Sequence, residues 1–376
     1  MLTVKEVKTR RDKKRFIQFQ NDLYKDCPYY VPTMMMDEMA NLNPKKNPAF
    51  DFCESRQWLV YKDGEIAGRV AAIVSHAAND IWGENRIRFS RIDFIEDYEV
   101  FCLLIKQVED WGKQLNLTEI IGPMGFCDFD KEGMLVSGFD RVSMFITYYN
   151  HPYYPEFLQR YGFEKEVDWV ENKVFIEGRD EKSVEQLDRI CERMMERYKL
   201  KYVECKSKRE IKPYIPEIFD LINQAYEQLF QVVPITQHMK DYYCGQFLAL
   251  LNLKYVGLVL NEEGKLIGLG VNAPSLVNSM KKHDGRLFPI GFIDLLKDIK
   301  HPKALDMYFV AVEKEYKNAG VPALLLNQLW HVCHETGVAY AETGPELELN
   351  YKVQGLWKGF KVDRNHKIRR CFKKSI

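Results

Sequence analysis

The stretch from Val312 to Leu326 combines residue types and spacing that suit the binding of an anion. An apolar strand is predicted to end at Val312, a short polar loop reaches Gly320, and an apolar helix is predicted to begin near Pro322. The first N–H groups of a helix have no partner inside it, so they bind phosphate with the aid of the helix dipole. Lys317 adds a positive charge at the mouth of the loop. The backbone N–H groups that we expect around a diphosphate belong to Asn318, Ala319, Gly320 and Val321.

The landmarks around this loop occur twice in the chain, in the same order. Asp63-Gly64 and Glu263-Gly264 each separate two β-rich runs, and a glycine in such a place predicts a β-hairpin. A repeated order of landmarks indicates a duplicated domain. The other paired landmarks are Tyr24 and Tyr226, each ahead of a Val-Pro pair, and Asn150 and Asn350, each ahead of a Gly-Phe pair.

The predicted elements follow one another in the same order in both halves. Strands alternate with helices, which is typical of an α/β sandwich with a mixed sheet. A charged helix over 179–197 is predicted to join two domains, residues 1–180 and 181–376. The predicted strands are 4–7, 58–61, 66–75 and 87–94, then 200–204, 255–260, 266–273 and 304–312, and the predicted helices are 13–24, 100–115, 215–229 and 323–335.

Length and composition limit the classes of partner. The chain has 376 residues, and its 54 basic and 54 acidic side chains give a net charge of zero. No overall field attracts a polyanion, so we expect a small-molecule substrate and no nucleic acid. No apolar run reaches the roughly 20 residues that cross a bilayer, so we expect no membrane partner. Nine scattered cysteines without a C-x-x-C pair indicate reduced thiols and a cytoplasmic location, and the oligomeric state is not predicted.

On these residues the chain resembles the GNAT superfamily, the acyl-CoA N-acyltransferases. The strand-loop-helix element of that family reads roughly V-x-P-x-Y-[RQ]-x-x-G-x-[GA]-x-x-L-L. The resemblance extends over both halves and implies two tandem GNAT-like domains, each with a mixed, mostly antiparallel sheet flanked by helices. Two positions depart from the pattern, because Lys317 replaces Arg or Gln and Pro322 replaces a small residue with a free amide. The positions in register are Val312, Tyr316, Lys317, Gly320, Leu325 and Leu326.

The resemblance also implies a cofactor and a catalytic scheme. Acetyl-CoA or another acyl-CoA would be the co-substrate, and a backbone N–H near Val310 or Val312 would polarise its thioester carbonyl. Acyl transfer to an amine further needs a neutral amine and a proton for the leaving thiolate. The tyrosine that usually supplies this proton is replaced by Gly355, so we name Tyr351 and Tyr308 as candidates.

The closing section of the second half supplies two further candidates. The resemblance implies that Asn350 contacts the cofactor arm. Glu342, at the end of the penultimate strand, is a candidate base that acts directly or through water, and a solvated strand-end carboxylate is the alternative. No metal site is predicted, because His331 and His334 stand at i, i+3 with no third ligand in sight.

The first copy differs at the position of the loop. The segment Glu96-Asp97-Tyr98-Glu99 follows its central strand and contains no glycine. Carboxylates at a helix start suit the helix dipole but repel a pyrophosphate. We therefore expect the acyl-CoA site in residues 181–376, and a structural or specificity role for residues 1–180 without a phosphate-binding loop.

The sequence as a whole favours an acyl-CoA-dependent N-acyltransferase, in the simplest case an acetyltransferase, that acts on a small amine or amino-acid-like acceptor. One alternative is a Fem-type aminoacyltransferase, which also pairs two GNAT-like domains and uses aminoacyl-tRNA. The other alternative is a non-catalytic protein that binds acyl-CoA or another ligand on the same fold.

Overall fold

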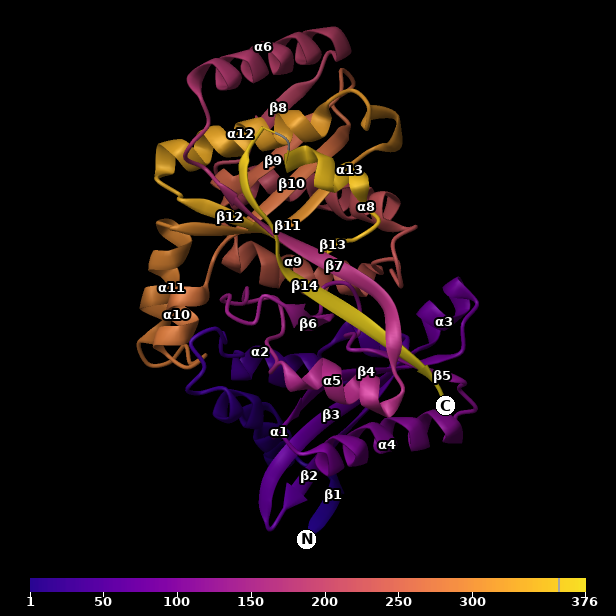
Figure 1. Cartoon of the computed structure of the whole chain (residues 1–376). Helices are drawn as coiled ribbons and strands as arrows, with labels where there is room; N and C mark the ends of the chain where they lie inside the picture. Colours follow the sequence, from indigo (N-terminus) through magenta and orange to yellow (C-terminus); the bar gives the residue numbers. More distant parts are fainter. Residues whose placement is uncertain (358) are drawn as a thin grey trace. The chain divides into compact units, whose positions relative to one another are not determined.

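The computed structural model describes residues 1–357 and 359–376, with the side chains of all of these except 247 and 352. The chain forms two compact units (Figure 1). Unit 1 consists of Met1–Val170, Val277–Phe292 and Lys367–Ile376, and unit 2 consists of Glu171–Leu276 and Ile293–His366.

The sheet of unit 1 has the strand order β1-β2-β3-β4-β5-β14. Neighbouring strands are antiparallel except for β4 and β5, which run parallel. The predicted hairpin turn at Asp63-Gly64 is present, and both residues have a positive φ that a tight turn of this kind requires. The strands are β1 (Leu2–Glu6), β2 (Cys53–Lys62), β3 (Glu65–Ser75), β4 (Arg86–Phe94), β5 (Glu119–Gly122) and β14 (Lys361–Ser375), with the short β6 (Met134–Ser137) paired to β14.

Helices cover both faces of this sheet because alternate residues of its strands are apolar on both sides. Val70 and Ala72 of β3 pack in the core beneath α4 (Tyr98–Gln114), whereas Ala71 and Ile73 pack in a second core with α1 (Arg10–Leu23). Further helices of the first half are α2 (Met35–Asn41), α3 (His76–Trp82) and α5 (Tyr153–Tyr161), with a 3₁₀ turn at Pro48–Asp51.

The sheet of unit 2 has the strand order β8-β9-β10-β11-β12-β7. Here β11 and β12 are the parallel pair, in the place that β4 and β5 take in unit 1. The second predicted hairpin turn, at Glu263-Gly264, is also present, with a φ of 80° at Gly264. The strands are β8 (Lys201–Glu204), β9 (Val256–Leu260), β10 (Leu266–Pro274), β11 (Ala304–Val312), β12 (Tyr340–Thr343) and β7 (Glu164–Phe175), with the short β13 (Glu346–Leu347) paired to β7.

Two helices position the ends of β11. The apolar helix α12 (Val321–Thr336) packs on the sheet in a core that also receives α6 (Glu181–Tyr198) through Cys191 and Met194. The helix α8 (Ile215–Tyr226) lies against β10 and β11. The remaining helices are α7 (Lys208–Ile211), α9 (Gln237–Leu250), α10 (Val277–Lys282), α11 (Gly291–Lys300) and α13 (Tyr351–Gln354), with 3₁₀ turns at Lys212–Tyr214, Leu253–Tyr255, Lys314–Tyr316 and Gly355–Trp357.

The last strand of each half of the sequence is exchanged. Strand β7, which ends the first half, pairs with β12 of unit 2 and places Lys173 opposite Glu342. Strand β14, which ends the chain, pairs with β5 of unit 1 and places Phe372 opposite Gly122. Each of these strands begins in one unit and ends in the other. Residues 171–180 therefore belong to unit 2, and residues 277–292 and 367–376 belong to unit 1, unlike in the predicted division at residue 180.

The central strand of each sheet contains a β-bulge. In β4 the bulge lies at Arg91, which has a φ of 47°. In β11, Met307 and Phe309 lie opposite consecutive residues of β10, so Tyr308 is the extra residue. A bulge bends a strand and re-aims its side chains, and bulges are frequent beside active sites.

Among the helices of residues 1–357 and 359–376, none combines the length and the apolar character needed to span a bilayer.

Candidate functional site

The parallel strands β11 and β12 separate midway along β11. They are paired from Ala304 to Met307, and the amide of Gly344 then donates to the carbonyl of Met307 at 2.9 Å. Strand β12 ends at Thr343, whereas β11 continues to Val312. The second half of β11 therefore offers an edge that no strand of the described chain occupies on this side.

This open edge leads directly to the predicted anion-binding loop. After a 3₁₀ turn the chain reaches Gly320, which has a φ of 79°, and α12 begins at Val321. Gly320 is the N-cap of α12, so no side chain at the cap accepts a hydrogen bond from the first amides of the helix. The positive φ favours glycine here, and a Cβ on Gly320 would lie 2.5 Å from the sulfur of Met194, so that side chain would have to shift for any larger residue. The strand, the loop and the helix N-terminus that the sequence predicted here are therefore all present in the structure.

The side chains of the loop divide into two groups. Ala319 and Val321 point into the core beneath α6, and the amide of Ala319 donates to the carbonyl of Tyr316 at 3.0 Å. Lys317 and Asn318 are exposed. The loop thus keeps a cation and a helix N-terminus on its outer side, while one of the four amides predicted for the cradle is used within the turn.

The corresponding helix of unit 1 has its N-terminus filled by the chain itself. Asp97 is the N-cap of α4, and its carboxylate accepts from the amides of Glu99 at 2.9 Å and Val100 at 3.3 Å. A hydrogen bond from Lys62 at 2.6 Å and these amides hold the pKa of Asp97 below its usual value. An N-terminus that already holds a carboxylate has no free donors for a phosphate.

The open edge of β11 is covered by a tyrosine. The hydroxyl of Tyr226, the last residue of α8, donates to the carbonyl of Val310 at 2.9 Å, and the amide of Val310 donates to the same hydroxyl at 3.2 Å. The backbone groups of Val310 therefore point toward the open side and away from β10. The amide that the family resemblance assigns to a thioester carbonyl is here bonded to a phenol.

Unit 1 closes the same edge more completely. The amide of Phe94 donates to the hydroxyl of Tyr154 at 2.7 Å, and the hydroxyls of Tyr153 and Tyr154 both donate to the carbonyl of Phe94. The rings of Phe94 and Tyr154 stack with centroids 4.0 Å apart, and Tyr154 is fully buried. Tyr226 in unit 2 is only half-buried. Displacing it exposes less apolar surface than displacing Tyr154 would.

A group of acidic side chains and a histidine lies where β11, β12, β7 and β14 meet in unit 2. Asp306 pairs in register with Glu342, and Glu342 pairs with Lys173 of the exchanged strand β7. Nitrogen and oxygen atoms of Glu171, Glu342 and His366 all lie within 4.8 Å of one another. The distance between His366 Nε2 and Glu342 Oε2 is 3.9 Å. This spacing is too long for a direct hydrogen bond, and it suits a bound cation.

The negative charge of this group raises the pKa of two nearby tyrosines. Burial and the charge of Asp306 raise the pKa of Tyr308 well above its usual value. Burial, followed by the charges of Glu342 and Asp306, raises the pKa of Tyr340. Both phenols therefore stay protonated, and Tyr308 at the bulge remains a hydrogen-bond donor.

The other predicted residues lie beyond the end of β12. Asn350 is the residue before α13, and Tyr351 opens that helix with 70% of its side chain exposed. Between them and β12, the carboxylate of Glu346 accepts from Trp357 at 3.1 Å and from Asn172 at 3.3 Å. Burial, partly offset by these hydrogen bonds and one from Thr343, raises the pKa of Glu346 to about 7.

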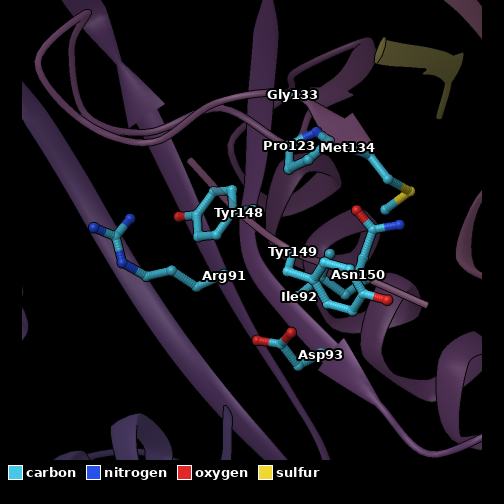
Figure 2. A pocket seen from close by; sticks show the side chains of 9 residues that line it. All are labelled: Arg91, Ile92, Asp93, Pro123, Gly133, Met134, Tyr148, Tyr149 and Asn150. Carbon is cyan, nitrogen blue, oxygen red and sulfur yellow. The ribbon is translucent and has the colours of Figure 1, made fainter. Parts of the chain in front are cut away.

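Unit 1 contains a small pocket beside the bulge in β4 (Figure 2). Each of its two charged lining residues is paired with residues outside the lining. Arg91 forms ion pairs with Glu38 and with Asp130, the latter at 2.8 Å, and Asp93 accepts from Arg69 at 2.7 Å. Figure 2 shows Arg91 and Tyr148 on one side of the pocket and Asn150 on the other. Asn150 donates to and accepts from the backbone of Leu135, so its polar atoms serve β6.

The site in unit 2 gathers some predicted residues and adds others. Val310, Val312 and the loop up to Val321 follow one another along a single strand-loop-helix path. Glu342 lies in the acidic group instead, and Asn350 and Tyr351 lie on the segment after β13. Sequence reasoning missed the chemical roles that Tyr226, Glu171, His366 and Glu346 can take. Only Tyr226 had given a signal, as the repeat of Tyr24.

No protein-family model matches the chain. Two curated proteins are similar to it over most of their length. Protein YghO of Escherichia coli is 25% identical over 293 residues, which cover 77% of this chain and 73% of that protein. The bacterial ceramide synthase of Caulobacter vibrioides is 24% identical over 325 residues, which cover 85% of this chain and 82% of that protein.

Solved structures are similar over the whole chain. A tandem GNAT protein from the clavulanic acid biosynthesis pathway matches with a TM-score of 0.57 at 12% identity, over 99% of this chain and 98% of that one. The GCN5-related glucosamine N-acetyltransferase region of a fungal multi-domain GH3 β-N-acetylglucosaminidase matches with a TM-score of 0.54 at 13% identity, over 100% of this chain and 38% of that one. The chain thus has the tandem GNAT fold, a mixed sheet flanked by helices in each unit, and this confirms the fold predicted from the sequence.

Proposed function

We propose that the protein transfers an acyl group from acyl-CoA to a primary amine, and that unit 2 carries the reaction. The observation that carries this proposal is the path in unit 2 from the open edge of β11 to the uncapped N-terminus of α12. In unit 1 the helix N-terminus holds a carboxylate and the edge is closed by two tyrosines, of which Tyr154 is fully buried, whereas in unit 2 the half-buried Tyr226 covers the edge and no side chain caps α12.

The residues of unit 2 suit coenzyme A at both ends of this path. The outer side of the loop offers the amides at the start of α12 and the ammonium of Lys317 to a diphosphate. The backbone of Val310 offers one donor and one acceptor to an extended arm, once the hydroxyl of Tyr226 moves aside. When bound, acyl-CoA supplies the thioester that the amine attacks.

Tyr226 is the proposed proton donor for the leaving thiolate. Its hydroxyl already lies at hydrogen-bond distance from the backbone of Val310, which the resemblance places beside the thioester carbonyl. A phenol that gives up its bonds to Val310 has its proton available at this point. This assignment fills the role left vacant at Gly355 and replaces Tyr351, whose side chain is 70% exposed.

Glu342 is the proposed proton acceptor, and distance decides how it acts. Its register partner Asp306 and Val310 pair with Ala273 and Gly270 of β10, which are three residues apart, so the separation is about 10 Å at the rise of a strand. Glu342 cannot touch an amine that attacks a thioester held at Val310, so it accepts the proton through water.

The negative field of this group also favours an acceptor that arrives as an ammonium ion. Asp306, Glu342 and Glu171 attract a cation, and transfer of its proton to Glu342 yields the neutral amine that acyl transfer needs. The relative from Caulobacter vibrioides is a ceramide synthase, and ceramide is itself an amide of a fatty acid with an amino alcohol. An amino alcohol is therefore the acceptor class that we propose to examine first.

The test is release of coenzyme A thiol from acetyl-CoA and from long-chain acyl-CoA in the presence of a panel of amines, including amino alcohols. We expect amine-dependent thiol release, and Glu342→Gln should lower the rate by about 10²–10⁴-fold. Calorimetric binding of acyl-CoA without any turnover would support the non-catalytic alternative. If the chain shows no binding of acyl-CoA and no turnover, the proposed function is ruled out.

A further inference from the structure

The loop before α11 and the first turns of α11 expose large apolar side chains. Phe288 is 68% exposed, Ile290 is 59% exposed and Leu296 is 57% exposed. Phe292 and Ile293 belong to the same run, and the rings of Phe288 and Phe292 lie 6.0 Å apart. These residues come from the loop before α11 and the first turns of α11, so their proximity follows from the local chain. Folded chains rarely leave so many large apolar side chains of one short segment in water without a binding role.

The exposed residues of α11 lie on one side of the helix, where Lys297 also pairs with Asp294 at 3.4 Å. At about 100° per residue, one arc of about 140° around the helix axis holds five residues, which are, in order around the axis, Phe292, Leu296, Lys300, Ile293 and Lys297. Those five side chains are all exposed. The two acidic residues of the helix, Asp294 and Asp298, lie outside this arc and are half-buried. The exposed face of α11 is therefore apolar and basic, which is the composition of helices that lie in a membrane interface.

The charge of the surrounding segment has the same sign. Residues 281–303 contain six Lys or Arg side chains and three Asp side chains, a net charge of +3 in a chain whose total is zero. A second copy of this chain would present the same positive charge, so like-charge repulsion opposes self-association through this face. An anionic surface gains from both the apolar and the basic side chains.

We propose that the segment 288–300, named here the α11 ridge, docks the protein onto an anionic lipid bilayer. The apolar side chains of the ridge enter the region between headgroups and acyl chains, and Lys297 and Lys300 stay at the level of the lipid phosphates. No membrane partner was expected because no apolar run is long enough to cross a bilayer, but a helix that lies in the interface needs no such run. The total charge of zero averages this local excess away. The docking does not depend on the proposed acyl transfer.

The experiment is co-sedimentation of the full chain with vesicles, without acyl-CoA or acceptor. One set of vesicles is pure phosphatidylcholine, and the other contains 30% phosphatidylglycerol, on the order of an anionic bacterial surface. We expect at least tenfold stronger partitioning onto the anionic vesicles, and weaker partitioning as salt is raised. The double variant F288S/L296S should lower the partition coefficient at least tenfold. The double variant K297E/K300E should lower it at least tenfold and abolish the preference for phosphatidylglycerol.

Matched controls change exposed residues elsewhere. Ile190, on α6, is 50% exposed and apolar, so Ile190→Ser removes the same kind of surface without touching the ridge. Lys45 is exposed in unit 1, so Lys45→Glu reverses a charge away from the ridge. Both should sediment like the unaltered chain. The proposal is overturned if the unaltered chain fails to sediment with anionic vesicles, or if F288S/L296S leaves sedimentation unchanged. It is also overturned if light scattering shows that the ridge forms a dimer that F288S/L296S dissolves.

Discussion

Replacing Tyr226 by phenylalanine separates a chemical role of its hydroxyl from a structural one. The change removes two hydrogen bonds to Val310, at 2.9 and 3.2 Å, and keeps the ring, which lies 6.4 Å from that of Phe309. Each such bond contributes about 0.5–1.5 kcal/mol to the free energy of unfolding. We therefore expect a loss of about 1–3 kcal/mol, measured by urea denaturation.

The effect on catalysis should be much larger than this loss of stability suggests. A missing proton donor lowers kcat by about 10²–10⁴-fold. Acyl-CoA should bind Tyr226→Phe at least as tightly as the unaltered chain, because its arm no longer competes with the hydroxyl for Val310. Thiol release gives kcat, and calorimetry gives the dissociation constant of acyl-CoA.

Tyr255→Phe is the matched control for this variant. The hydroxyl of Tyr255 donates to Thr336 at 3.0 Å, at the far end of α12, so its loss costs about 1 kcal/mol of stability. It should leave kcat unchanged. If Tyr226→Phe keeps full kcat while both variants lose stability, Tyr226 is structural and the assignment of the proton donor is wrong.

Three further perturbations address the loop, the first copy and Glu346. Lys317→Glu should weaken coenzyme A binding at least tenfold by calorimetry, whereas Lys45→Glu should not, and equal affinities would count against a diphosphate at this loop. Asp97→Ala should lower the free energy of unfolding by about 1 kcal/mol with unchanged coenzyme A affinity, because it removes the cap of α4 and an ion pair with Lys62, both within unit 1. Since the pKa of Glu346 is raised from 4.5 to about 7 in the folded chain, its protonated form stabilises the fold below pH 4.5, and this stability is lost as pH rises to about 7. Between pH 4.5 and 7, the free energy of unfolding measured with urea should therefore fall by about 2–3 kcal/mol less in Glu346→Gln than in the unaltered chain. Parallel plots of this free energy against pH for the two proteins would contradict the raised pKa.

The local elements of both units could be predicted from the sequence. The strand predicted over 304–312 is β11, and the helix predicted over 323–335 is α12 with slightly wider bounds. The turns at Gly64 and Gly264, and the start of a helix after Gly320, follow from backbone requirements that act over a few residues. The residues that impose such requirements lie next to the element in the sequence, so the sequence alone shows them.

The acidic group of unit 2 could not be predicted in this way. Glu171, Glu342 and His366 stand far apart in the chain and meet only because β7 and β14 are exchanged. Hydrophobic periodicity identifies strands but not their partners, since a strand with apolar faces pairs equally well with either copy of a duplicated sheet. The bulge at Tyr308 and the hydroxyl of Tyr226 on Val310 depend likewise on tertiary packing.

The exchange of strands has a consequence for any attempt to divide the chain. Residues 367–376 end the second half of the sequence, yet they complete the sheet of unit 1 through the pairing of β14 with β5. Phe372 and Cys371 in this segment are fully buried, and Phe372 belongs to the core beneath α4. Removing residues 367–376 should therefore destabilise unit 1 and leave the edge of β5 unpaired.

Limited proteolysis with mass spectrometry measures this effect. After the truncation, cleavage within residues 1–170 should become faster than cleavage within residues 181–276. The point variant Phe372→Ala tests the same dependence with the backbone pairing intact, and large-to-small changes at buried aromatic positions cost about 3–5 kcal/mol. If unit 1 of the truncated chain resists protease as well as the full chain does, β14 is not required there. In that case the two halves are independent domains, as the duplication in the sequence had predicted.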